Sequence, residues 1–90
     1  MNKCIVTVLG HDKVGIIGRV CTYLAQSDAN ILDITQSIIS GYFYMMLVVD
    51  ITKINKDFAI MLGELEKLGQ ELGVDIRCQK AEIFEKMHNL

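Results

Sequence analysis

The segment Gly10–Gly15 is the part of the chain whose residue types best suit ligand binding. It joins an apolar run to the start of a predicted helix, where first-turn N–H groups lack intrahelical partners and carry the positive end of the helix dipole. Gly15 has no side chain at a point where a ligand could approach the backbone. A carboxylate or phosphate would suit this arrangement, and an ordinary strand-to-helix turn capped by Asp12 is the alternative.

The same segment lacks the residues that nucleotide hydrolysis needs. It has the GxxxxG spacing of a P-loop, but Ile16 and Ile17 stand where that motif requires Lys and Ser or Thr. The chain has no GxSxG or HExxH motif. Its two histidines, His11 and His88, have no second ligand at metal spacing. The sequence therefore predicts no catalytic residues, no metal and no cofactor.

Asn30 is a second polar candidate, at the start of the second predicted strand. Its amide could donate and accept hydrogen bonds with a ligand, although Asn also starts strands simply because it tolerates turn conformations. In the topology predicted below, this turn lies at the opposite end of the subunit from Gly10–Gly15. Only a dimer would easily bring both segments to one ligand.

The elements that position these residues alternate between strand and helix patterns. Apolar and β-branched runs predict four strands, at Lys3–Leu9, Asn30–Ile39, Tyr42–Thr52 and Val74–Lys80. The first and third strands are apolar on both faces, so both of their faces should be covered. The second alternates apolar and polar residues, which predicts a half-buried strand.

Two longer segments have apolar residues at helical spacing. Residues 14–27 form one predicted helix, with a buried face made by Ile17, Val20, Cys21 and Leu24. The second carries the stripe Phe58, Met61, Leu62, Leu65, Leu68 and Leu72, with Asn55 as the expected N-cap and Gly73 at its C-terminal end. A short third helix is expected over residues 82–90.

The resulting order, βαββαβ plus a terminal helix, predicts an α+β fold. The ferredoxin-like sandwich fits best, with two helices on one face of a four-stranded antiparallel sheet. It places the first and third strands in the centre, in agreement with their apolar pattern. The chain therefore predicts a single domain over residues 1–90, with the core in about 1–80.

The composition predicts that another chain covers part of the surface. Of the 90 residues, 51% are hydrophobic, a high share for a small domain with proportionally more surface. Much of this excess falls on the helix-free side of the sheet and on one face of the tail. The predicted homodimer interface consists of Tyr42, Tyr44, Met46, Val48, Phe84 and Met87.

The net charge of −2 argues against nucleic acids and anionic membranes as partners, since their binders usually carry a basic patch. The longest apolar run, Tyr42–Val49, is too short to span a membrane, and the N-terminus does not read as a signal peptide. Three cysteines without a CxxC step predict reduced thiols in a cytoplasmic protein.

The combined pattern resembles the ACT domain, the small-molecule regulatory module of amino-acid metabolism. The likeness rests on three segments, 8–16 (VLGHDKVGI), 29–34 (ANILDI) and the hairpin at 41–43 (GYF), and covers nearly the whole chain. It is strongest to stand-alone ACT proteins of bacteria and archaea that look like the N-terminal part of glycine-cleavage transcriptional repressors. The ending AEIFEKMH at 81–88 is also similar to that family.

The resemblance implies a homodimer that encloses an amino acid between its subunits. Loop residues of one subunit would face the ligand, namely Gly10, His11, Asp12, Val14, Gly15 and Ile16. Asn30 and Ile31 would come from the partner. Many ACT sequences have Pro before the loop glycine, where this chain has Val14, which restores a backbone donor. The chain would act as a non-catalytic sensor on a protein partner that the sequence does not identify.

Three other functions are compatible with the sequence. An RNA-binding module of the same topology would stack bases on Tyr42 and Tyr44, but it would need basic surroundings. A protein-interaction module without a ligand would share the apolar surface. A small enzyme of the acylphosphatase type would pair Arg19 with Asn30, which lie in different elements with poor geometry.

Overall fold

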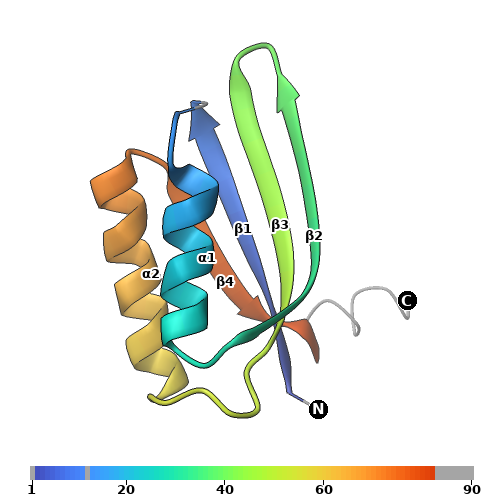
Figure 1. Cartoon of the computed structure of the whole chain (residues 1–90), viewed down its shortest axis with the longest axis vertical. Helices are drawn as coiled ribbons and strands as arrows, with labels where there is room; N and C mark the ends of the chain where they lie inside the picture. Colours follow the sequence, from blue (N-terminus) through green and yellow to red (C-terminus); the bar gives the residue numbers. More distant parts are fainter. Residues whose placement is uncertain (1, 12, 83–90) are drawn as a thin grey trace.

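The computed structural model describes residues 2–11 and 13–82, and Figure 1 shows their arrangement. The elements follow one another as β1 (Lys3–His11), α1 (Ile16–Gln26), β2 (Asn30–Ile39), β3 (Tyr42–Asp50), α2 (Phe58–Leu72) and β4 (Asp75–Lys80). The predicted order βαββαβ is thus confirmed. Ala81 and Glu82 are helical, and the rest of the predicted terminal helix, with Phe84 and Met87, lies outside the described residues.

The four strands form one antiparallel sheet in the order β2-β3-β1-β4, with β1 and β3 in the centre as predicted. Both helices lie on one face of this sheet, so the fold is the ferredoxin-like sandwich (Figure 1). Lys3 of β1 and Asn30 of β2 both pair with Asp50 of β3, at one end of the sheet. His11 and Ile39 both pair with Tyr42 at the other end.

The core lies between the sheet and the two helices. Alternate residues of the central strands point into it, namely Cys4, Val6 and Val8 of β1 and Phe43, Met45, Leu47 and Val49 of β3. The helices add Ile16, Val20, Leu24, Met61, Leu65 and Leu68. Burying each large aliphatic side chain contributes about 1.5–3 kcal/mol, so this layer is the main source of stability.

The predicted start of α1 was wrong. Gly15 is the N-cap residue, with a left-handed backbone at φ 92°, so the helix begins at Ile16 and not after Asp12. The buried face also differs from the predicted one: Ile16 is buried in the core, whereas the predicted core residue Ile17 is 39% exposed. Asp12 itself lies outside the described residues.

Asn55 does not cap α2 as predicted, because Asp57 is the N-cap residue and the Asn55 side chain bonds to the end of α1. The prediction for Gly73 is confirmed: it ends α2 with a left-handed backbone at φ 71°. Strand β3 ends two residues before the predicted Thr52. There the Asp50 carboxylate accepts hydrogen bonds from the Thr52 N–H at 2.9 Å and hydroxyl at 2.6 Å, which turns the chain.

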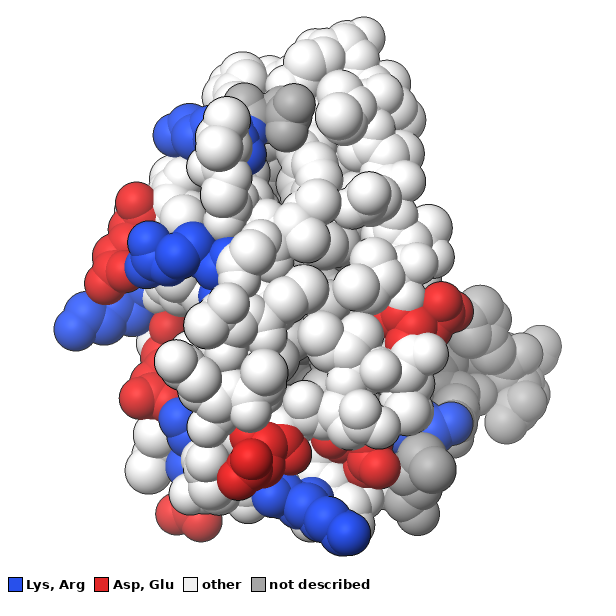
Figure 2. Space-filling model, in the orientation of Figure 1, with Lys and Arg blue, Asp and Glu red and all other residues white. Residues whose placement is uncertain are grey.

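Strand β2 is an exposed edge strand, not the half-buried strand predicted. Every residue from Leu32 to Ile39 is exposed, and the pairing with β3 shifts between Ile31 and Asp33, which places a bulge at Leu32. The β2–β3 hairpin projects beyond the helices (Figure 1). No Asp, Glu, Lys or Arg occurs in the stretch 34–49, and Figure 2 accordingly shows the projecting end without charged side chains.

Candidate functional site

The backbone at the start of α1 is open to a ligand. A Cβ on Gly15 would meet nothing within 4 Å, so this position leaves a gap in the surface. The first helical hydrogen bond runs from the Arg19 N–H to the Gly15 carbonyl at 2.9 Å. The N–H groups that precede Arg19 in the first turn of α1 have no intrahelical partner and favour an anion.

Gly10 has a packing role on the strand side of the loop. A Cβ there would lie 2.7 Å from Cγ1 and 3.2 Å from Cα of Val74, closer than real contacts allow. Only glycine lets β1 pass this close to the chain that leads from α2 into β4. The glycine at this loop position is therefore explained by packing, whatever the loop binds.

The structure separates the other loop residues predicted to face a ligand. Val14 is fully exposed beside Gly15, whereas the Ile16 side chain is buried and leaves only its backbone for contact. The exposed His11 ring stacks on Tyr42, with ring centroids 4.7 Å apart, at the tip of the hairpin. Gly15 and Val14 are thus the loop residues that stand open at the helix terminus.

Asn30 and Ile31 lie at the opposite end of the sheet, as the topology predicted. Asn30 is exposed and opposite Asp50, and Ile31 is half-buried against the core. Between the two ends, β1 extends over eight residue steps, or about 26 Å. A single chain therefore does not bring the two predicted halves of the site together.

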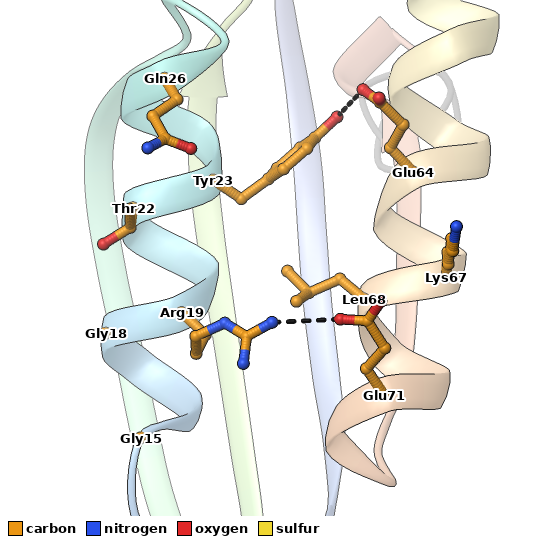
Figure 3. A pocket seen from close by; sticks show the side chains of 10 residues that line it. All are labelled: Gly15, Gly18, Arg19, Thr22, Tyr23, Gln26, Glu64, Lys67, Leu68 and Glu71. Atoms are coloured by element: carbon orange, nitrogen blue, oxygen red, sulfur yellow. Dashed lines mark hydrogen bonds and ion pairs between the residues drawn. The ribbon is translucent and has the colours of Figure 1, made fainter.

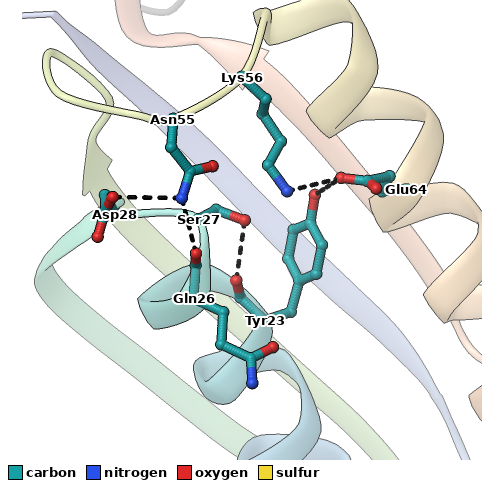
Figure 4. Close-up of polar contacts among 7 residues, drawn as sticks. All are labelled: Tyr23, Gln26, Ser27, Asp28, Asn55, Lys56 and Glu64. Carbon is teal, nitrogen blue, oxygen red and sulfur yellow. Dashed lines mark hydrogen bonds and ion pairs between the residues drawn. The ribbon is translucent and has the colours of Figure 1, made fainter.

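A shallow hollow of about 440 Å³ marks the turn between α1 and β2, lined by Asp28, Ala29, Asn30 and Lys53. Asn55 holds this turn in place (Figure 4). Its amide donates to the Gln26 carbonyl at 2.9 Å and to Asp28 Oδ2 at 3.2 Å, and its N–H donates to the Ser27 carbonyl at 3.1 Å. Sequence reasoning found Asn30 here but missed Asp28 and Lys53.

A second hollow, of about 560 Å³, lies between α1 and α2 on the side away from the sheet (Figure 3). The Arg19 guanidinium and Glu71 carboxylate are 3.1 Å apart across it. The Tyr23 hydroxyl donates to Glu64 at 2.7 Å, and Lys56 lies 2.8 Å from the same oxygen. These bonds lower the pKa of Glu64, and the Lys56 bond contributes most. The charges of Arg19, Glu71 and Glu64 are paired across or beside this groove, so these bonds join the helices. Lys67 lines the groove without an ion pair among the described residues.

The four described residues of the predicted dimer interface share the helix-free face of the sheet. Tyr42 and Tyr44 are 51% and 38% exposed, and Met46 and Val48 are half-buried. Ile5 and Leu9 of β1 lie beside them by register. We call this set of six residues the sheet face.

A second set of exposed apolar side chains, which sequence reasoning missed, lies on β2 and at the start of α1. It consists of Leu32, Ile34 and Ile38 of β2 with Val14 and Ile17, all of them exposed. We call it the β2 edge. Because β2 is the last strand of the sheet, its outer N–H and C=O groups have no strand partner among the described residues. The absence of charged residues from the stretch 34–49 is the sequence feature that could have indicated this surface.

The cysteines are free thiols, with Cys4 and Cys78 on neighbouring strands. A thiol–thiol hydrogen bond from Cys78 lowers the pKa of Cys4, and the same bond, with burial, raises the pKa of Cys78. No group of three His, Cys, Asp or Glu within the described ranges is arranged to hold a metal ion. Among the described helices, none is long and apolar enough to cross a membrane.

Comparisons with known proteins give a consistent result. The family model for the ACT domain matches residues 2–79. A UPF0237 protein of Bifidobacterium longum is 60% identical over all 90 residues of both chains, and one of Methanocaldococcus jannaschii is 43% identical over the same length. The solved ACT domain protein from Streptococcus pneumoniae is 43% identical, with a TM-score of 0.83 over 93% of this chain and 94% of that one.

More distant structures share the fold within longer chains. The regulatory subunit of aspartate kinase from Thermus thermophilus is 25% identical, with a TM-score of 0.63 over 87% of this chain and 50% of that one. A glycine cleavage system transcriptional repressor has a TM-score of 0.77 over 88% of this chain and 45% of its own, at 19% identity. With a family match over most of its length and relatives of equal length, the chain belongs to the ACT domain family, in the group of UPF0237 proteins.

Proposed function

We propose that the protein is a non-catalytic regulatory module that binds an amino acid, or a similar small carboxylate, between two copies of the chain. The observation that carries this proposal is the pair of half-sites at opposite ends of one subunit. The open first turn of α1 at Gly15 suits a carboxylate, and the hollow at Asn30 adds polar groups. Membership of the ACT family, whose domains are regulatory in related proteins such as the aspartate kinase subunit, supports the same function.

Pairing along the β2 edge would unite the two half-sites. Two β2 strands that pair antiparallel place the loop end of one copy beside the turn end of the other. In such a pair, the helices of both copies lie on the same side of one continuous sheet. Gly15 of one copy and the α1–β2 turn of the other therefore both lie in the helix layer. Stacking through the sheet face alone would leave the helix layers on opposite sides of the assembly. The shared site therefore favours edge pairing.

The sheet face remains a proposed contact between copies. Its apolar residues lie on a face that no described helix covers, and their removal from water would favour association. Once edge pairing has formed the site, this contact would join two such pairs back to back. The predicted interface residues Tyr42, Tyr44, Met46 and Val48 belong to this second contact.

Regulation would follow from linkage. A ligand held by two chains binds the pair better than the separate chains, so it shifts the assembly equilibrium. A cytoplasmic protein partner that recognises one assembly state would then read the ligand concentration. The module itself needs no catalytic group for this role.

Thermal shift with a panel of amino acids tests the proposal. We expect at least one amino acid to raise the melting temperature, and its carboxamide derivative to have no effect, because the N–H groups at Gly15 select an anion. Gly15→Ala should remove the response, since it adds a Cβ where the ligand approaches. Gly41→Ala is a matched control, with a φ of 82° and equally open surroundings. A protein that no amino acid stabilises would contradict the proposal.

RNA binding is the second candidate, and one observation favours it. The stacked rings of His11 and Tyr42 lie at the end of the sheet face that carries Tyr44, which resembles a platform for bases. The uncharged stretch 34–49 argues against it, because backbone phosphates need nearby Lys or Arg. Salt-sensitive retention of RNA in a filter assay would favour this candidate over ligand sensing.

A further inference from the structure

Lys53 lies beside Asn30 although 23 positions separate them in the sequence. Both line the hollow at the α1–β2 turn, together with Asp28 and Ala29. The β3–α2 connection that carries Lys53 is fastened to this turn by the three hydrogen bonds of Asn55 (Figure 4). Lys53 is therefore part of a braced structure at the second half-site.

The charges in this hollow form no ion pair among the described residues. The ion pairs among the described residues involve Arg19, Lys56 and Arg77, and neither Lys53 nor Asp28 takes part in one. Asp28 accepts a hydrogen bond only from the neutral amide of Asn55 within the described chain. Its backbone is left-handed, with φ 59°, and the Asn55 bond helps to hold the carboxylate at the hollow.

A free ammonium, a carboxylate and an amide at one turn complement particular groups of a ligand. The first turn of α1 in the other copy suits one carboxylate. Asp28 suits an ammonium, and Lys53 suits a second anionic group. An amino acid with a carboxylate side chain presents all three groups.

We propose that Lys53 is a specificity-determining residue of the shared site and that the ligand is an acidic amino acid. Lys53 of one copy would bind the side-chain carboxylate, with Asn30 beside it as a hydrogen-bond partner. This inference rests on the proposed amino-acid binding and adds the chemical class of the ligand. A neutral amino acid would leave the Lys53 ammonium without its anion.

Titration of the ¹⁵N-labelled protein tests this inference. The probes are L-aspartate and L-glutamate, against L-asparagine and L-glutamine, in which a neutral amide of similar size replaces the side-chain carboxylate. We expect an acidic amino acid to bind about tenfold more tightly than its amide and to shift the backbone signals of Asn30 and Lys53. Lys53→Gln should abolish that preference. Lys67→Gln, which removes an exposed lysine from the groove between the helices, should preserve it.

The outcomes separate this inference from the proposed function. If acidic amino acids and their amides bind equally well, or if Lys53→Gln keeps the preference, the role of Lys53 is wrong while amino-acid binding stands. If no amino acid binds, the same titration with succinate tests whether the hollow binds an anion. Shifts at Asn30 and Lys53 that Lys53→Gln removes would keep the anion site and reject the amino-acid sensor. The absence of such shifts would reject both.

Discussion

The β2 edge and the sheet face are both apolar and exposed, but they differ in what they offer a second copy. The edge presents a row of backbone groups that no described strand pairs, together with Ile34 and Ile38. The face presents side chains only, and its own backbone groups are paired within the sheet. Backbone pairing fixes strand direction and register, whereas side-chain packing tolerates several relative orientations. An edge contact can therefore build a site with defined geometry, and a face contact mainly adds stability.

The edge has few of the features that usually keep edge strands apart. The chain has no proline, and Asp33 is the only charged residue of β2. Natural edge strands are commonly protected by lysine, proline or bulges, and here the only such device is the bulge at Leu32. The region from Asp33 to the hairpin is thus free to pair. The sheet face, by contrast, has charged neighbours in Lys3, Arg77 and Asp75.

Ile38→Lys should have the largest effect, because it places a charge within the proposed strand pairing, near the hairpin end of β2. We expect this variant to lose the edge contact, so that at most the contact through the sheet face remains, and to lose the ligand-induced rise in melting temperature. Sedimentation equilibrium and thermal shift measure the two effects. Ile60→Lys is the matched control, since Ile60 is 52% exposed on α2, away from β2. An Ile38→Lys variant that still pairs and responds would place the site elsewhere.

Tyr44→Lys should have a smaller effect, limited to the contact between pairs. Tyr44 is 38% exposed on the sheet face, and a lysine there would repel its counterpart across a face-to-face contact. Sedimentation should show tetramers reduced to dimers, with an unchanged response to the ligand. Loss of the response in this variant, with β2 intact, would instead assign the shared site to the sheet face.

Asn55→Ala should lower stability and loosen the turn that the edge pairing presents to the partner. Each lost hydrogen bond contributes about 1 kcal/mol, and 1 kcal/mol shifts the melting temperature of a domain this size by roughly 4–8 °C. Thermal unfolding measures the decrease. Gln70→Ala, on the exposed side of α2, should change little. An unaltered melting temperature for Asn55→Ala would mean that the turn does not depend on this brace.

Glu64→Gln should have the smallest effect, and it should depend on pH. Hydrogen bonds from Lys56 and Tyr23 hold the pKa of Glu64 below its ordinary value of 4.5 in the folded state. A lowered folded pKa means that the stabilisation is present above the unfolded pKa and disappears as the pH falls through the folded one. The difference in melting temperature between wild type and variant should therefore be full near neutral pH and shrink in acid. A difference that grows in acid would contradict this.

The fold could be predicted from the sequence because local pattern and topology agreed. Strands β1 and β3 are the most apolar, and the sandwich places them in the centre of the sheet, where one face of each packs against the helices and the other forms the sheet face. The details that failed depend on backbone angles and tertiary contacts. The start of α1 depends on the left-handed Gly15, and the role of Asn55 depends on a turn 27 residues earlier in the chain.

The candidate site could be predicted only in part for the same reason. Gly15 and Asn30 are recognisable from short segments, because each stands at the boundary of a helix or strand. Lys53 belongs to no motif, and only the folded chain places it beside Asn30. The predicted topology already placed β2 at the border of the sheet, but the alternation of Leu32, Ile34 and Ile38 predicted one buried face. Only the folded chain shows that these side chains are exposed, because the β2–β3 hairpin projects beyond the helices.

Mixing two inactive variants is the most direct test of a site shared between copies. Gly15→Ala removes the half-site at the first turn of α1, and Asn30→Ala removes the half-site at the α1–β2 turn. Each variant alone should therefore bind no ligand. In mixed dimers, the intact loop of one chain meets the intact turn of the other. Re-equilibrated equal amounts should therefore recover about a quarter of the wild-type sites, measured by calorimetric titration with the stabilising amino acid. No recovery after confirmed subunit exchange would mean that each site lies within a single chain, and would contradict the account.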